Sequence, residues 1–259
     1  MKICFSKISD IRVEAPGTWD NNIFLTFDID WACDEVLEDT IDLVEKADVA
    51  ATWFVTHDSP LLERLRANPK FELGIHPNFN FLLEGNARNG RNIEEITDRL
   101  LSIVPGAKSV RSHSMTQNGP ILQLFYDKGL VYDCNHFVPE RSGIQLKPWR
   151  LCNRLMKVPH FWEDDDVFIY NDTVDIRALC RRRGIKVFTF HPIHVFLNTE
   201  NTERYESTRP WHHDPEKLIK HQGDHPNGTR KLLKQLLEQA GEGDQKGNRQ
   251  LKDTDTSYR

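Results

Sequence analysis

The sequence predicts an α/β fold in which parallel strands form a sheet or a barrel. Short apolar runs alternate with segments whose apolar residues have helical spacing. The run at residues 23–27 is apolar apart from one threonine, as expected for a strand buried on both faces of a parallel sheet. Two carboxylates, Asp28 and Asp30, follow this strand directly. In parallel α/β proteins the carboxyl ends of the strands collect ligands and catalytic groups.

The expected elements follow one another along the chain in strand and helix pairs. We expect strands at residues 23–27, 49–55, 71–75, 108–111, 130–132 and 186–190. We expect helices at residues 34–46, 61–67, 93–104, 121–128, 174–183 and 228–240. Residues 197–228 are rich in Asn, Glu, His and Pro, so a long polar loop is expected there.

Length and composition limit the class of protein. The 259 residues suffice for one catalytic domain, which we place at residues 1–240, and the polar segment 241–259 is expected to be a disordered tail. A formal net charge of −5 gives no basis for nucleic-acid binding. Five scattered cysteines favour a reducing compartment. Without a secretion signal or an apolar run of membrane-spanning length, we expect a soluble cytoplasmic protein of open oligomeric state.

The two carboxylates that follow the first strand indicate a cation site. Because side chains alternate along a strand, Asp28 and Asp30 are expected to point the same way. Two like charges side by side are costly unless a cation or a shared proton relieves the repulsion. The rest of the chain must then supply the other ligands of a metal.

His76 is the first candidate for such a ligand. It follows the strand at residues 71–75, and Pro77 suits the first position of a helix, so Asn80 is expected one turn further on, facing the same point. A carboxylate and a histidine from neighbouring strand ends form half of a zinc or iron site. Asn80 is the weaker ligand, because an amide oxygen binds such metals less well than imidazole does.

Two further strand ends carry candidate catalytic groups. His191 ends the strand at residues 186–190 and is favoured over His194 as a general acid, because imidazole titrates near neutral pH. His194 is then expected to orient the substrate. Arg111 and His113 follow the strand at residues 108–111. Arg111 can pair with Asp28 or Asp30, and His113 is a candidate substrate-binding residue.

Trp162 precedes four acidic residues and is a candidate for substrate contact. Its ring suits a sugar or a small acyl methyl group, although a core tryptophan beside an acidic loop fits the pattern equally well. Either Glu163 or Asp164 could accept a hydrogen bond from the catalytic histidine, and spacing does not choose between them.

Taken in order, these motifs resemble the polysaccharide deacetylase family, also called the NodB-homology carbohydrate esterases. The resemblance covers roughly residues 24–237. Residues 26–30 (Thr-Phe-Asp-Ile-Asp) resemble its first motif, residues 51–55 (Ala-Thr-Trp-Phe-Val) its second strand, and residues 76–80 (His-Pro-Asn-Phe-Asn) its His-x-x-x-His motif with the second histidine replaced. Of the Arg-x-Pro-Tyr motif only Arg111 remains. Phe161-Trp162 and Phe190-His191-Pro192 resemble the later motifs.

The resemblance implies both a fold and a mechanism. The fold is an irregular (β/α)7-type barrel, and the reaction is metal-dependent hydrolysis of an N-acyl group, acetyl or formyl, on an amino sugar. Asp28 is implied as general base, His191 as general acid and Arg111 as the partner of Asp28. Asp30, His76 and Asn80 (or a water) are implied to hold a divalent metal, zinc first, with Co, Fe, Ni or Mn as alternatives. Trp162 is implied to pack on the acyl methyl.

The motifs at residues 76–80 and 190–194 most resemble a divergent WbmS-like branch associated with O-antigen gene clusters. That branch implies a sugar or sugar-nucleotide substrate in the cytoplasm. Two other interpretations stay open. A haloacid-dehalogenase-type phosphatase also begins with a strand ending in Asp-x-Asp, but it gives no role to His76 or His191. A sugar-binding relative could have kept the barrel and lost the metal together with the second histidine.

Overall fold

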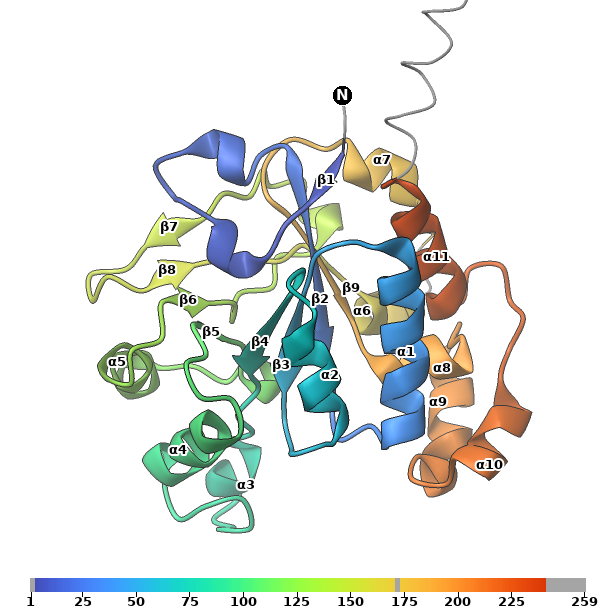
Figure 1. Cartoon of the computed structure of the whole chain (residues 1–259), viewed down its shortest axis with the longest axis horizontal. Coiled ribbons are helices and arrows are strands. Elements are labelled where there is room, and N and C mark those ends of the chain that lie inside the picture. The colour runs from blue at the N-terminus through green and yellow to red at the C-terminus, as the bar shows by residue number, and fades with distance from the viewer. Residues whose placement is uncertain (1–2, 171–172, 241–259) are drawn as a thin grey trace, which may run out of the picture.

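The structure is a computed structural model in which residues 3–170 and 173–240 are described. The expectation of a disordered tail at residues 241–259 therefore lies outside the described residues. In the described part, one mostly parallel sheet runs through the molecule, with helices on either side of it (Figure 1). No helix in these two ranges is long and apolar enough to cross a bilayer.

The sheet is curled and open. Its strands are β1 (Cys4–Phe5), β2 (Asn22–Asp28), β3 (Ala51–Val55), β4 (Phe71–Ile75), β5 (Ser109–Val110), β6 (Tyr132–Asp133), β7 (Trp149–Arg150), β8 (Met156–Lys157), β9 (Trp162–Glu163) and β10 (Lys186–Phe190). Their order is β7-β8-β6-β5-β4-β3-β2-β10-β9, with β1 paired to β2. All pairs are parallel except β7 with β8. The sheet is therefore a half-barrel of the expected irregular kind.

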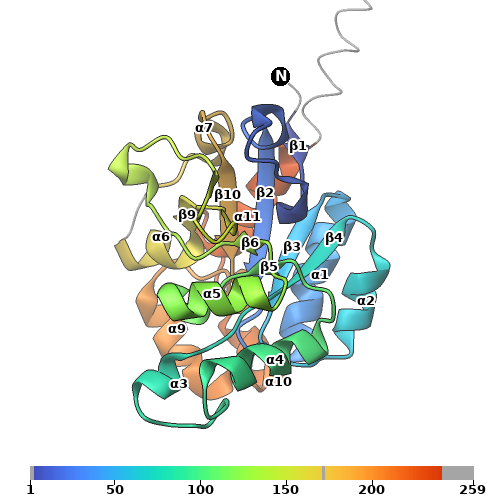
Figure 2. The same ribbon diagram turned by 90° about the vertical axis from the view of Figure 1, so that its left-hand side faces the viewer.

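The helices connect these strands and cover the sheet. They are α1 (Asp34–Ala47), α2 (Leu61–Ala67), α3 (Asn80–Leu83), α4 (Ile93–Ile103), α5 (Gly119–Asp127), α6 (Asp164–Tyr170), α7 (Ile176–Cys180), α8 (Pro192–Leu197), α9 (Thr202–Thr208), α10 (Pro215–Leu218) and α11 (Thr229–Glu238). Helix α1 packs against α2, α8 and α11 on one side, whereas α4 and α5 lie on the other (Figures 1 and 2).

The core lies between the sheet and these helices. Strands β3, β2 and β10 lie side by side between β4 and β9, and β3 and β10 are buried along their whole length. Phe27 stacks on Trp53 of the neighbouring strand with ring centroids 4.2 Å apart. Because parallel strands point the same way, the carboxyl ends of β2, β4 and β10 come together at the end of the molecule that carries α3, α9 and α10 (Figure 1).

The prediction of a long polar loop at residues 197–228 is wrong, because this segment contains short helices. Asn201 and Asp214 cap α9 and α10 through side-chain oxygens that accept hydrogen bonds from Arg204 and Lys217 backbone N–H groups. A small apolar cluster that includes Phe196 and Leu218 holds the segment against α8. Scattered apolar residues in a polar segment thus sufficed to anchor it.

Candidate metal centre and active site

Asp28 and Asp30 differ in backbone conformation, because Asp28 is the last residue of β2 and Asp30 lies in the turn that follows it. Strand β2 ends at Asp28, and the Ile29 N–H still donates to the Phe54 carbonyl at 3.2 Å. Asp30 and Trp31 then have φ values of 33° and 56°, in the left-handed region that side chains rarely adopt. The turn sends the chain away from the sheet directly after the two carboxylates, and strain of this kind is common at functional sites.

The carboxylate of Asp28 is paired with a buried arginine. Arg111 Nη1 lies 2.9 Å from Asp28 Oδ1, and it also donates to Thr26 Oγ1 at 3.1 Å. Both side chains are nearly inaccessible, with 2% and 6% of their surface exposed. The guanidinium lies over the ring of Phe54, with Cζ 4.5 Å from the ring centroid. The predicted partner of Asp28 is thus in place, and its charge offsets that of the carboxylate.

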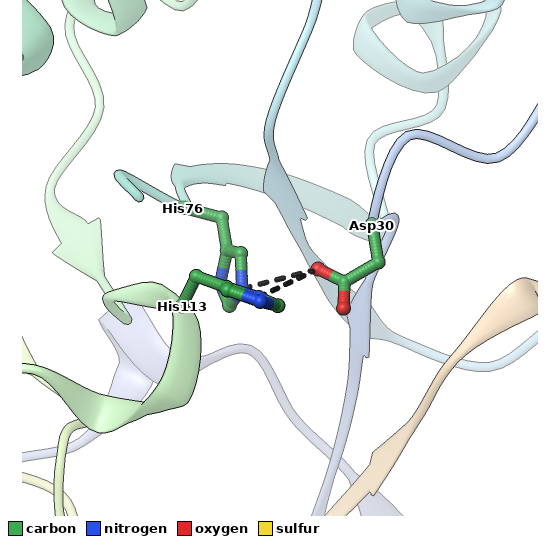
Figure 3. A group of neighbouring side chains, drawn as sticks. All are labelled: Asp30, His76 and His113. Atoms are coloured by element: carbon green, nitrogen blue, oxygen red, sulfur yellow. Dashed lines mark hydrogen bonds and ion pairs between the residues drawn. The ribbon is translucent and has the colours of Figure 1, made fainter. Parts of the chain in front are cut away.

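Asp30, His76 and His113 form a compact group at the ends of β2, β4 and β5 (Figure 3). His76 Nε2 lies 3.2 Å from Asp30 Oδ1, and His113 Nδ1 lies 3.5 Å from the same oxygen. The nitrogens His76 Nε2 and His113 Nδ1 are 3.4 Å apart. On its other side, His76 Nδ1 lies 3.8 Å from Asp28 Oδ1, so its ring stands between the two carboxylates.

This group fits a divalent metal. One oxygen and two imidazole nitrogens are the donor set of catalytic zinc sites. Ligands about 2.1 Å from one tetrahedral ion are separated by roughly 3.4 Å, close to the separations found here. Asp30 Oδ1 is buried and has no hydrogen-bond partner within the described residues. Burial raises the pKa of Asp30, but the neighbouring imidazoles of His113 and His76 outweigh it and hold that pKa well below its usual value.

Asn80 occupies a different position from the one its spacing predicts. Helix α3 begins at Asn80 itself, with Phe79 at its N-cap, so Asn80 is not one helical turn beyond His76. Its amide nitrogen donates to Ser114 Oγ at 3.0 Å, and its amide oxygen accepts from Thr116 Oγ1 at 3.0 Å. Asn80 therefore fastens the short segment that carries His113. Its role as a metal ligand stays a prediction.

A second group of acids and histidines surrounds the predicted general acid. His191 Nδ1 lies 2.7 Å from Asp164 Oδ1, and the other oxygen of Asp164 accepts from the His191 backbone N–H at 2.9 Å. Asp164 is therefore the carboxylate partner of His191, whereas Glu163 lies 3.2 Å from His160 Nε2. Asp165 Oδ1 is 3.0 Å from His194 Nε2 and 3.4 Å from His191 Nδ1. Asp165, His191 and His194 also lie close enough together to hold a metal.

The charges of this second group favour a protonated His191. Burial lowers the pKa of His191, but the neighbouring carboxylates of Asp165 and Asp164 outweigh it and hold that pKa well above its ordinary value. Burial also raises the pKa of Asp165, yet the charges of His191 and His194 lower it to about 2. His191 Nε2 faces the first group, 3.8 Å from Asp30 Oδ2. The imidazolium thus presents a proton beside the candidate metal centre.

One cavity of about 540 Å³ joins the two groups. Its lining includes Asp30 and His113 from the first group, Asp165, His191 and His194 from the second, and Trp31. Trp31 stands edge-on to His113, with ring centroids 5.2 Å apart. The predicted substrate-binding residues His113 and His194 therefore line the cavity.

Trp162 has another environment. It is 4% exposed and packs against Phe190 in the core, with ring centroids 4.7 Å apart, and it is absent from the cavity lining. The sequence left a core position open for this residue, and its burial does not support a contact with an acyl group. Trp31, for which the sequence predicted no role, instead presents an aromatic ring to the cavity. Its place one residue after the Asp-x-Asp motif was the available clue.

Comparison with known proteins points to one family. The family model described as WbmS-like polysaccharide deacetylase matches residues 25–209. The structure of WbmS from Bordetella bronchiseptica, a proposed polysaccharide deacetylase involved in O-antigen biosynthesis, is 49% identical with a TM-score of 0.85 and covers 91% of this chain and 98% of that chain. A proposed polysaccharide deacetylase from Mycobacterium smegmatis is 17% identical with a TM-score of 0.43, over 66% of this chain and 77% of that one.

Among functionally curated proteins, none matches the chain. The family model nevertheless spans most of the described residues, and the similarity to the Bordetella structure extends over nearly the whole chain. The expected fold and the expected family are both confirmed. The chain belongs to the WbmS-like polysaccharide deacetylase family.

Proposed function

We propose that the protein hydrolyses the N-acyl group, acetyl or formyl, of an amino sugar. One observation carries this proposal: a three-residue group suited to a metal has both a carboxylate paired with a buried arginine and a carboxylate-bound histidine beside it, each 3.8 Å from one of its members. This arrangement supplies a candidate base and a candidate acid next to the candidate metal centre.

Asp30, His76 and His113 would hold the metal, zinc first because of the donor set, with Co, Fe, Ni or Mn as alternatives. When bound, a divalent ion supplies a Lewis acid that polarises the amide carbonyl and lowers the pKa of water. His113 takes the place that the motif comparison gave to Asn80. Asn80 in turn positions the segment of His113 through Ser114 and Thr116.

The protons move between two residues of the chain. Asp28 accepts a proton from the attacking water, and Arg111 fixes its carboxylate from the buried side. The carbon–nitrogen bond then breaks as His191 donates its Nε2 proton to the departing amine. Asp164 holds the His191 ring through Nδ1 and stabilises the imidazolium before transfer. The products are a carboxylic acid and the free amino sugar.

Two observations support the substrate class that we propose: the lining of the cavity and the description of one relative. Trp31 offers an aromatic ring to a sugar, and His194 lines the same cavity. The Bordetella relative is described as involved in O-antigen biosynthesis, so we propose a sugar-nucleotide or surface-polysaccharide precursor as substrate. Five free cysteines suit a reducing cytoplasm as the site of this reaction.

The alternative of a sugar-binding relative without catalysis has less support, because base, acid and three candidate ligands are all retained. Because the chain belongs to the deacetylase family, the alternative of a haloacid-dehalogenase-type phosphatase has no support.

The test is mass spectrometry of a panel of N-acetylated and N-formylated amino sugars and their nucleotide forms, incubated with the protein and added Zn²⁺ or Co²⁺. We expect loss of one acyl mass from some member, absent with D28N. A panel left intact under all metals would contradict the proposed function.

A further inference from the structure

The cavity has an uneven distribution of charge. Beside its histidines, its fixed negative charges are Asp30 and Asp165, near the candidate catalytic groups, and Glu206 of α9. Among the described residues, Arg88, on the segment between α3 and α4, is the only arginine or lysine in the lining. Apart from the histidines, an anionic ligand would meet three carboxylates that repel it and, among the described lining residues, one guanidinium that attracts it.

The guanidinium of Arg88 is held but not neutralised. Its Cζ lies 5.4 Å from the centroid of the Phe81 ring, which also lines the cavity. In the described part of the chain it has neither a hydrogen bond nor an ion pair. Arg91, three residues further on, differs: its Nη2 lies 2.6 Å from Glu95 Oε1, and it does not line the cavity.

The segment that carries Arg88 is ordered by its own hydrogen bonds. The Asn86 N–H donates to the Phe81 carbonyl at 2.7 Å, and the Arg88 N–H donates to Asn86 Oδ1 at 2.9 Å. The backbone at Arg88 is therefore fixed before a ligand arrives, which lowers the entropy cost of binding.

We propose that Arg88 binds an anionic group of the substrate, a carboxylate or a phosphate, while the acyl group lies against Asp30, His76 and His113. This proposal rests on the proposed function and names its substrate as an anionic amino sugar. The planar fork of arginine matches both anions through paired hydrogen bonds. The ring of Phe81 lies next to that fork at the cavity wall. The neighbouring amide of Asn89, also in the lining, can donate to the same group.

The test compares ligand binding rather than turnover. Calorimetry on the full-length, zinc-loaded protein would use N-acetylglucosamine, its 6-phosphate, its 6-carboxylate (the uronic acid) and its uridine diphosphate form. We expect at least one anionic ligand to bind more tightly than the neutral sugar. R88A should lower the affinity for that ligand by roughly ten- to a hundredfold, the range for hydrogen bonds to charged groups. The affinity for the neutral sugar should not change. R88K should lose part of the affinity.

R91A is the matched control, because it removes a similarly exposed arginine that is already paired. The ligand with the largest loss in R88A identifies the anion as a carboxylate, a phosphate monoester or a diphosphate. Equal affinity for neutral and anionic sugars, or an equal effect of R91A, would overturn the proposal. Because binding needs no turnover, an R88A effect without hydrolysis would reject the proposed function alone. Hydrolysis without an R88A effect would reject this inference alone.

Discussion

His113 Nδ1 lies 3.5 Å from Asp30 Oδ1, so an imidazole from the segment after β5 reaches the carboxylate that follows β2. His76, from the end of β4, reaches the same oxygen. The ends of three strands therefore supply one candidate metal centre, although the second histidine of the family motif is replaced by Asn80.

Mutation of Asp28 and mutation of Asp30 are expected to have different effects on metal binding. D28N should lower kcat by about 10²- to 10⁴-fold, the usual contribution of a general base, and keep the bound metal. D30N should lose both activity and metal, because it removes the anionic ligand. Metal content per chain and kcat, measured on the same preparations, check this prediction. A loss of metal in D28N equal to that in D30N would show that the roles are not divided.

Arg111 is expected to act as a positioning residue. R111M leaves the Asp28 charge buried without its partner, so we expect the free energy of unfolding to fall by about 3–5 kcal/mol. R111K keeps the charge and should recover part of both stability and kcat. Urea unfolding and steady-state kinetics on both variants provide the measurement. If R111M matched the wild type in kcat, Arg111 would have no part in holding the base.

His191 is expected to accelerate hydrolysis only for substrates whose leaving group needs a proton. H191A should lower kcat for an N-acetyl amino sugar by about 10²- to 10⁴-fold. Hydrolysis of 4-nitrophenyl acetate should fall far less, because nitrophenolate leaves without protonation. The comparison of amide and ester rates in one variant is its own control. Equal losses for the two substrates would argue against His191 as the acid.

His160 gives the stability of the fold a dependence on pH. Burial lowers the pKa of His160 in the folded protein, whereas an unfolded histidine titrates near about 6.5. The unfolded state then binds more protons below about pH 6.5, so the free energy of unfolding should fall as the pH decreases. In H160Q the slope below about pH 6.5 should shrink by up to about 1.4 kcal/mol per pH unit. Urea unfolding between pH 5 and 8 measures both slopes, and identical slopes would contradict the assignment.

Much of the fold was predictable because its central strands are strongly apolar. Residues 186–190 were expected as a strand from composition alone and form β10, and the expected strand at 49–55 appears as Ala51–Val55. The two-residue strands β7 and β9 were missed because so short a segment has no periodicity. The antiparallel β7–β8 pair also depends on sheet contacts that no local pattern encodes.

The candidate site was predictable where a strand delivers the side chain. Asp28, His76 and His191 all lie at or directly after strand ends, as their apolar runs indicated. The sequence predicts His113 as a substrate-binding residue and not as a metal ligand. Its orientation depends on a short turn in which Ser114 has φ 54°, and no local pattern indicates that turn. Asn80 was placed by helical spacing, but residues 76–79 precede the helix. Tertiary contacts, not spacing, decide both positions.

The central claim is that Asp30, His76 and His113 hold the catalytic metal, and metal content tests it most directly. Wild type, H113A and N80A would be purified, loaded with Zn²⁺, passed through a desalting column and analysed by inductively coupled plasma mass spectrometry, with circular dichroism to confirm folding. We predict about one zinc per chain in the wild type, a large loss in folded H113A, and near wild-type zinc in N80A. Full zinc in H113A together with loss in N80A would contradict the account.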